Sequence, residues 1–273
     1  MRIDEHTTIP HLLKERVQRG ATRPLILRKI GIGDTWRSIT AREFYDEVHA
    51  LAAGLIARGL EPGDRVAIMS RTRYEWTLLD FACWAAGLVP VPIYETSSID
   101  QVAHVLVDAD VTLIITETVS MAEIVRAAAE REKRANTHVL SLDSEAIDTL
   151  IADGSATPRE RVLARSEALT KDDIATIVYT SGTTGTPKGT VLSHENFTNL
   201  CLNAHAWMPE IAAGKNSRLL LFLPLAHVFA RFLQVFQISG NGVLGHASNI
   251  KNLLGDLASF KPSYLLVVPR VLE

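Results

Sequence analysis

The sequence predicts an α/β fold in which helices cover a mostly parallel β-sheet, and three observations support this prediction. Short apolar runs alternate along the 273 residues with longer segments of helical periodicity, as is typical of parallel sheets. Capping boxes, in which Ser or Thr is followed three positions later by Glu or Gln, mark helix starts. A content of 47% hydrophobic and 22% charged residues is that of an ordinary globular chain.

The elements follow from these signals in chain order. Apolar runs predict strands at 66–69, 89–93, 111–115, 139–142, 174–179, 219–223 and 264–268. Capping boxes predict helices that start at Thr40…Glu43, Thr72…Glu75, Ser98…Gln101, Ser120…Glu123 and Thr157…Glu160. After Thr40, apolar residues recur every three or four positions from Phe44 to Leu55, which is the spacing of one helix face. The interval 153–158 is the least structured and is predicted to be a surface loop.

Charge and cysteine content exclude several classes of protein. The net charge is −3 with both signs interspersed, so nothing supports nucleic-acid binding. The chain has two cysteines, Cys83 and Cys201, and both lie in apolar stretches. They are interpreted as core residues in a reducing compartment rather than as a disulfide or a metal site.

Two apolar stretches approach the length of a membrane span, at 78–94 and 219–238. Both are interrupted by charged residues and proline, whereas a spanning helix needs about 20 mostly apolar residues. The N-terminus has no apolar signal region. We therefore expect a cytoplasmic protein without a transmembrane span.

Residues 179–189 read Tyr-Thr-Ser-Gly-Thr-Thr-Gly-Thr-Pro-Lys-Gly and place hydroxyl groups and glycines around one cation, Lys188. Glycine allows positive φ angles and a close approach of the backbone to a ligand. Exposed N–H and hydroxyl groups then form a concave set of donors that suits a polyphosphate. The sequence predicts a phosphate-binding loop here.

A plain Gly/Ser/Thr linker is the alternative interpretation of this segment. However, the segment lies directly between the apolar runs 174–179 and 190–192, so it joins two strands rather than two domains. The Walker pattern requires Lys to be followed by Ser or Thr, whereas Lys188 is followed by Gly189. The segment therefore does not match the phosphate loop of P-loop NTPases.

The loop resembles the phosphate-binding signature of the adenylate-forming acyl-CoA synthetase superfamily. Further stretches match that family in the same order: Pro-Leu-Ala-His-Val-Phe at 224–229, Lys-Pro-Ser at 261–263 and Val-Pro-Arg-Val-Leu-Glu at 268–273. The stretch Tyr-Glu-Thr-Ser-Ser at 94–98 is similar to the long-chain fatty acid branch. The resemblance extends from about residue 10 to the last residue.

The resemblance implies an AMP-binding domain over 10–273 with the stacked helix–sheet–helix layers of the large N-terminal domain, here truncated. The first layer is expected at about 50–195, and the second at about 200–273 together with 10–45. We expect residues 10–45 to pack against 215–273. Family motifs for Mg²⁺ and ribose, and a C-terminal domain with a catalytic lysine, have no match here. The chain is thus expected to be the N-terminal part of a longer enzyme and inactive alone.

The activity implied by the resemblance is that of an ATP-dependent long-chain fatty acid–CoA ligase, an acid–thiol ligase. A carboxylate and ATP give acyl-AMP and pyrophosphate, and coenzyme A then forms the thioester. Lys188 and His227 are implied as catalytic, with His227 orienting the reactants or gating the site. The implied ATP-binding residues are Thr180, Ser181, Gly182, Thr183, Thr184, Gly185 and Lys188, and Thr184 is implied in binding Mg²⁺. Ala230 departs from the Glu that long-chain members often carry.

Two other functions stay open at this point. The chain could be an adenylation domain that passes the acyl group to a carrier protein, or a non-catalytic nucleotide-binding module. His227 on an apolar segment could also be an ordinary core histidine. The implied partners are a fatty acid, ATP and coenzyme A; a homodimer and peripheral contact with the inner membrane face are further alternatives.

Overall fold

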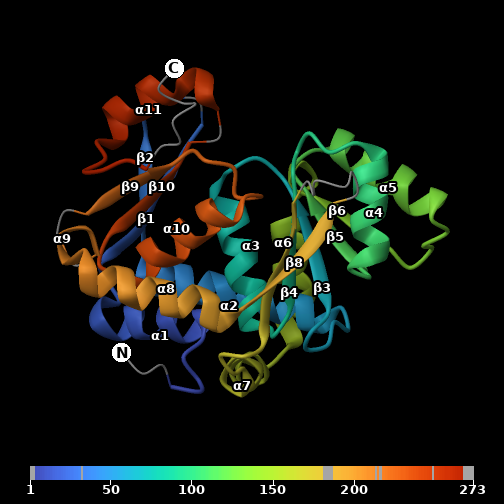
Figure 1. Ribbon diagram of the computed structural model, residues 1–273, viewed down its shortest axis with the longest axis horizontal. Coiled ribbons are helices and arrows are strands. Elements are labelled where there is room, and N and C mark those ends of the chain that lie inside the picture. The colour runs from blue at the N-terminus through green and yellow to red at the C-terminus, as the bar shows by residue number, and fades with distance from the viewer. Residues whose placement is uncertain are drawn as a thin grey trace.

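The structure is a computed structural model that describes residues 4–31, 33–180, 187–212, 214, 217–247 and 249–266. Within these residues two four-stranded sheets and a two-stranded hairpin are surrounded by helices (Figure 1). The strands are β1 (Pro24–Lys29), β2 (Trp36–Thr40), β3 (Arg65–Met69), β4 (Val89–Ile93), β5 (Leu113–Thr116), β6 (His138–Ser141), β7 (Ile174–Thr180), β8 (Lys188–Ser193), β9 (Arg218–Leu221) and β10 (Val243–His246). The α/β prediction is confirmed.

The helices connect and cover these strands. They are α1 (Ile9–Gly20), α2 (Ala41–Ala57), α3 (Tyr74–Ala85), α4 (Ile99–Asp108), α5 (Val119–Arg131), α6 (Ala146–Asp153), α7 (Arg159–Ala168), α8 (His194–Trp207), α9 (Pro209–Ala212), α10 (Val228–Ser239) and α11 (Leu253–Phe260). Short 3₁₀ helices occupy Leu142–Ser144, Gly154–Ala156 and Ile250–Asn252. No helix among the described residues is long and apolar enough to cross a membrane.

The first sheet combines strands from both ends of the chain, in the order β2-β1-β10-β9. β1 runs parallel to β10, with Ile26 beside Leu244, and antiparallel to β2. β10 in turn runs parallel to β9. The N-terminal strands are therefore part of the same layer as the segment that follows residue 217.

The second sheet, in the order β4-β3-β5-β6, is parallel throughout. Its strands bury both faces, as expected for a parallel sheet between helices. Ala67 and Met69 of β3 face the cluster formed with α4 and α5, whereas Val66 and Ile68 face the larger core shared with the first sheet. Figure 1 shows α4 and α5 on the outer side of this sheet.

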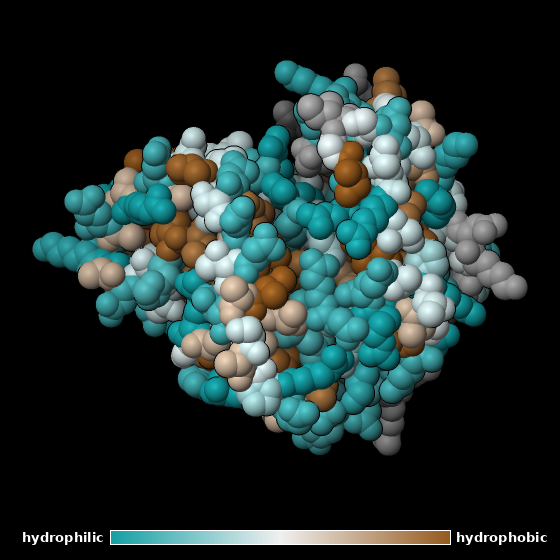
Figure 2. Space-filling model, turned by 180° about the vertical axis from the view of Figure 1, so that it is seen from behind, coloured by the Kyte–Doolittle hydropathy of each residue, from teal (hydrophilic) through white to brown (hydrophobic). Residues whose placement is uncertain are grey.

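α3 lies between the two sheets, and all twelve of its residues are buried (Figure 1). A helix that is apolar on every side belongs inside a core. Its aromatic residues Phe81 and Trp84 pack edge to face at 5.1 Å, and Phe44 of α2 joins Phe81 at 5.6 Å. One continuous apolar core therefore connects both sheets. From behind, hydrophobic residues reach the surface in separate areas among hydrophilic ones (Figure 2).

β7 and β8 are the two strands that the loop was predicted to join, and they form a hairpin. The strands are antiparallel, and Thr180 at the end of β7 pairs with Lys188 at the start of β8. β7 packs along β4, where the Thr176 hydroxyl donates to the Pro90 carbonyl at 2.7 Å. The hairpin is thus attached to the edge of the second sheet.

Six of the seven predicted strands are present within two residues of the predicted bounds, as β3 to β7 and β9. Of the run at 264–268, Tyr264 forms an isolated bridge to Leu219, and the residues from 267 lie outside the described part. β1, β2 and β10 were not predicted. The segment 153–158 lies at the surface as predicted, except for Gly154, which is buried against the backbone of Gly54. It is not an irregular loop, because Gly154–Ala156 form a 3₁₀ helix.

The capping boxes at Thr40 and Ser98 are confirmed, with both reciprocal hydrogen bonds formed. The other three are wrong. α3 begins after Arg73, α5 is capped by Thr118, and α7 follows Pro158. A hydroxyl caps a helix only when the backbone turns at that residue. The hydroxyl can also form a hydrogen bond with another part of the chain instead of with the helix N-terminus. An unpredicted box, formed by Ser193 and Asn196, starts α8.

Candidate functional site

Three segments singled out in the sequence meet at one pocket of about 400 Å³. The end of β4 and the start of α4 contribute Tyr94 and Ser97, which belong to the stretch at 94–98. The hairpin contributes Thr180 and Pro187, which flank the phosphate loop. The start of α10 contributes His227. The fold thus brings together residues that are more than 130 positions apart in the chain.

The ends of the phosphate loop are exposed at the edge of this pocket. Thr180 and Lys188 are opposite each other in the hairpin, and both side chains are exposed. Among the described residues, Lys188 forms no ion pair, so its charge is available to a ligand. The other predicted loop residues lie outside the described part of the chain: Ser181, Gly182, Thr183, Thr184 and Gly185.

The loop end of the hairpin is attached to α4 by two contacts that the sequence did not indicate. The Tyr179 hydroxyl donates to the Asp108 carboxylate at 2.6 Å, and burial raises the pKa of that phenol. His104 Nε2 lies 2.8 Å from the carbonyl oxygen of Pro187, and its ring stands edge-on to Tyr179. A Cβ on Gly189 would lie 2.9 Å from Ile177, which explains glycine after the lysine. Both ends of the loop are therefore held in place.

His227 is the N-cap of α10, and its Nδ1 accepts a hydrogen bond from the Phe229 N–H at 3.3 Å. In the neutral ring the proton is then on Nε2. The side chain is exposed, unlike that of a core histidine. The helix N-terminus carries partial positive charge. A donor and a positive helix end thus lie together at the pocket, an arrangement that suits an anion.

Thr72, predicted to cap a helix, instead holds the turn that precedes His227. Its buried hydroxyl donates to the Leu223 carbonyl at 2.7 Å and accepts from the Leu225 N–H at 3.0 Å. These partners are about 150 positions away, so no local pattern could reveal them. Ala230, one turn into α10, is fully buried.

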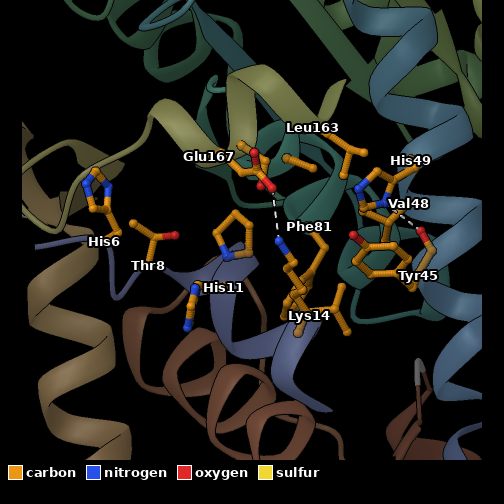
Figure 3. A pocket seen from close by; sticks show the side chains of 14 residues that line it. His6, Thr8, His11, Lys14, Tyr45, Val48, His49, Phe81, Leu163 and Glu167 are labelled. Carbon is orange, nitrogen blue, oxygen red and sulfur yellow. Dashed lines mark hydrogen bonds and ion pairs between the residues drawn. The ribbon is translucent and has the colours of Figure 1, made fainter. Parts of the chain in front are cut away.

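A second pocket, of about 260 Å³, lies between α1, α2 and α7 and contains none of the predicted site residues (Figure 3). Several of its polar groups already have partners. Lys14 and Glu167 face each other across it at 2.9 Å, and His49 Nδ1 lies 2.8 Å from the Tyr45 carbonyl oxygen. Among the described residues, no group of three or more His, Cys, Asp or Glu could hold a metal ion. The candidate site is therefore the pocket at the hairpin.

Comparison with known proteins agrees with the sequence motifs. The model of the AMP-binding enzyme family matches residues 13–273. The long-chain-fatty-acid–CoA ligase FadD15 of Mycobacterium bovis is 40% identical over 273 residues, which cover 99% of this chain and 45% of that protein. The long-chain-fatty-acid–CoA ligase ACSBG2 of Rattus norvegicus is 31% identical, over 97% of this chain and 42% of that protein. The chain spans about half the length of the curated relatives it matches.

Solved structures share the fold. A fatty acyl CoA synthetase of Mycobacterium tuberculosis superposes with a TM-score of 0.79 at 23% identity, over 98% of this chain and 51% of that one. VinN superposes with a TM-score of 0.78 at 18% identity, over 99% of this chain and 63% of that one. At these identities the likeness concerns the fold alone. Because the family model covers nearly all of the sequence, the chain belongs to the family of AMP-binding enzymes.

Proposed function

We propose that this chain forms the nucleotide- and acyl-binding part of an AMP-forming acid–thiol ligase that converts long-chain fatty acids to acyl-CoA. One observation carries the proposal. The stretch at 94–98, the ends of the phosphate loop and His227 line a single pocket. Relatives up to 40% identical are named long-chain-fatty-acid–CoA ligases, which supports this substrate class.

The first step joins the fatty carboxylate to the α-phosphate of ATP and releases pyrophosphate. An anion attacks a polyanion, so positioning and positive charge at the phosphates matter more than proton transfer. Lys188 and the loop from Thr180 to Gly185 would hold the β- and γ-phosphates. His227 would orient the carboxylate and the α-phosphate through its Nε2–H. Coenzyme A sulfur then attacks the acyl carbonyl, and AMP leaves.

We propose that Mg²⁺ enters this site as an ion carried mainly by the nucleotide. In such sites one or two carboxylates bind it together with phosphate and water, and among the described residues no group of three or more His, Cys, Asp or Glu could hold it alone. We propose the Thr184 hydroxyl for this role. When bound, the ion neutralises part of the phosphate charge.

The test is fatty-acid-dependent exchange of labelled pyrophosphate into ATP, with the natural protein at its full length and acids of graded chain length. Exchange that rises with long-chain acids supports the proposal. Thioester formation with free coenzyme A, but not with a phosphopantetheine carrier protein, identifies the acceptor. Binding of Mg·ATP with no exchange for any carboxylate would instead leave a nucleotide-binding module.

We also propose that the enzyme works in the cytoplasm, where reduced Cys83 and Cys201 persist, and takes its substrate from the inner membrane face. Long acyl chains partition into lipid, so peripheral contact would bring enzyme and substrate together. Co-sedimentation with anionic vesicles tests this contact, and light scattering tests whether a homodimer forms.

A further inference from the structure

A fully buried ion pair joins α3 to α10, the helix capped by His227, and its arginine also reaches β7, the strand that leads into the phosphate loop. Arg231 of α10 binds Asp80 of α3 through two hydrogen bonds, from Nη2 to Oδ1 at 2.6 Å and from Nε to Oδ2 at 3.2 Å. Neither side chain is exposed to solvent. The remaining arm of the guanidinium, Nη1, donates to the hydroxyl of Thr176 in β7. Arg231 thus connects three elements at once.

The hydrogen bonds around this pair can run in one direction only. The Thr176 hydroxyl donates to the Pro90 carbonyl, so it accepts from Arg231. The Gln234 amide N–H donates to Asp80 at 2.6 Å, so the Gln234 oxygen is left to accept from Thr77 at 2.8 Å. Burial raises the pKa of Asp80, and the Arg231 charge opposes that rise. The network continues from Thr77 to His246 Nε2 at 2.7 Å, and among the described residues the buried Nδ1 of that ring has no partner. The groups around Asp80 and Arg231 are paired, and paired buried groups hold one another rigidly.

Trp84 of α3 provides a second attachment for the same strand. Its indole N–H donates to the carbonyl of Ala175 at 2.7 Å, next to Thr176. The Arg231 guanidinium carbon lies 5.6 Å from the centre of the Trp84 ring. β7 is therefore fixed to α3 through its backbone and to α10 through a side chain.

The network lies close to the pocket along both elements. It is one helical turn away along α10 and four residues away along β7. β7 ends at Thr180, four residues after Thr176, and Arg231 follows His227 by four residues. Both Thr180 and His227 line the pocket. Arg231 therefore links the strand that leads to Thr180 with the helix that is capped by His227.

We propose that Asp80, Arg231 and Thr176 are positioning residues that hold Thr180, where the phosphate loop begins, and His227 at the separation needed by the nucleotide and the acyl carboxylate. This inference rests on the function proposed above. A stabilising role alone explains the arrangement poorly. Replacing a buried ion pair with apolar residues of similar volume is often neutral or stabilising, whereas a misplacement of about 1 Å at a reacting centre can cost about 100-fold in rate.

The experiment uses the natural full-length protein and measures both pyrophosphate exchange and thermal unfolding. Thr176→Val keeps the shape of the side chain but removes the acceptor of Arg231, and the pair Asp80→Leu with Arg231→Met removes the charges together. We expect the double variant to melt close to wild type, because it removes both charges together. Thr176→Val leaves Nη1 of Arg231 without its acceptor, so it should melt at a lower temperature but remain folded in the assay. Exchange should fall about 100-fold with a raised KM for ATP.

The matched control is the ion pair between Lys29 and Asp256, whose side chains are 19% and 4% exposed and which joins β1 to α11 away from the pocket. The pair Lys29→Met with Asp256→Leu should retain wild-type exchange. A further variant, Arg231→Lys, keeps the positive charge but lacks the planar guanidinium that donates to several partners at once. Its rate of pyrophosphate exchange should lie between those of wild type and Thr176→Val.

Folded Thr176→Val protein with wild-type exchange would overturn the inference, as would losses that merely match the loss of folded protein. If the double variant does not fold, the pyrophosphate exchange of Thr176→Val alone tests the inference. If wild-type protein exchanges no pyrophosphate with any carboxylate, the proposed function fails instead. The same variants are then compared for Mg·ATP affinity, and an unchanged affinity would overturn the positioning role.

Discussion

Lys188 is the residue for which the sequence makes the strongest claim. It is exposed at the start of β8 and, among the described residues, has no acidic partner, so a phosphate would meet its full charge. We predict that Lys188→Ala lowers pyrophosphate exchange about 100-fold without changing the melting temperature. Lys133→Ala, at an exposed lysine after α5, is the control and should leave exchange unchanged. Equal activity of the two variants would rule out the role of Lys188.

Buried histidines predict how stability depends on pH. His194 is buried and its Nδ1 accepts from the Ile9 N–H, and burial lowers its pKa to about 4. Burial also lowers the pKa of His246 to about 4. In the unfolded chain both pKa values return to about 6.5. The unfolded state therefore binds more protons below pH 6.5, and stability falls as the pH decreases from there toward 4.

Between about pH 6.5 and 5 the buried histidines dominate this effect, because carboxylates titrate mainly below that window. Burial also lowers the pKa values of His49 and His205, so these two residues contribute as well. Urea unfolding at pH 7.5, 6 and 5 should show a progressive loss of the free energy of unfolding, about 2 kcal/mol at pH 5 for each histidine whose pKa is lowered to about 4. His194→Asn keeps an acceptor near Nδ1 but does not titrate. It should have a shallower pH dependence; a slope equal to that of wild type would contradict the assignment.

At the scale of single residues, the sequence identified groups that a local motif displays. Lys188 and His227 stand in recognisable stretches, and the structure places the hairpin and the start of α10 at one pocket. Thr72, Asp80 and Arg231 could not be assigned their contacts, because each binds a partner about 150 positions away. Residues of these types occur in many environments, and only the tertiary fold determines which partners they bind.

The start of α2 offers a test at the scale of one element. The Thr40 hydroxyl accepts from the backbone N–H of Glu43, and the Glu43 carboxylate accepts from the backbone N–H of Thr40. We predict that Thr40→Ala lowers the free energy of unfolding by about 1 kcal/mol. Thr157→Ala is a matched control, because the sequence has the same pattern there but Thr157 does not cap a helix. Equal effects in urea unfolding would contradict this distinction.

Two of the three strands missed from the sequence, β2 and β10, have weak signals. β2 is an edge strand whose Arg37 and Ser38 are exposed, so it has no apolar run. β10 has four residues and includes Gly245, where a Cβ would lie 2.3 Å from the Phe260 ring. Glycine weakens a strand pattern, yet close packing against Phe260 requires it here. Tertiary contact therefore overrides the local preference at β10.

At the scale of the whole molecule, the joining of the two chain ends in one sheet exceeds what periodicity can reveal. Ile26 pairs with Leu244, and no local pattern in either segment indicates that the two strands are neighbours. Family resemblance supplied this expectation. We propose that the first layer comprises about residues 50–195, and that the second comprises about 200–273 together with 10–45.

This division predicts that the N-terminal segment can be supplied separately. Residues 1–40 carry α1, β1 and β2, and they pack on β10 and α10 of the remaining chain. Expressed as two polypeptides, 1–40 and 41–273 should co-purify, because β1 fills the gap beside β10 and α1 covers α10. β1 is paired on both sides, so Ile26→Pro removes a ladder hydrogen bond from an interior strand and should abolish co-purification. His11→Ala, at an exposed position on α1, should have no effect. Retention of the complex by Ile26→Pro would show that strand pairing does not hold the segment, and the proposed second layer would then have to be redrawn without residues 10–45.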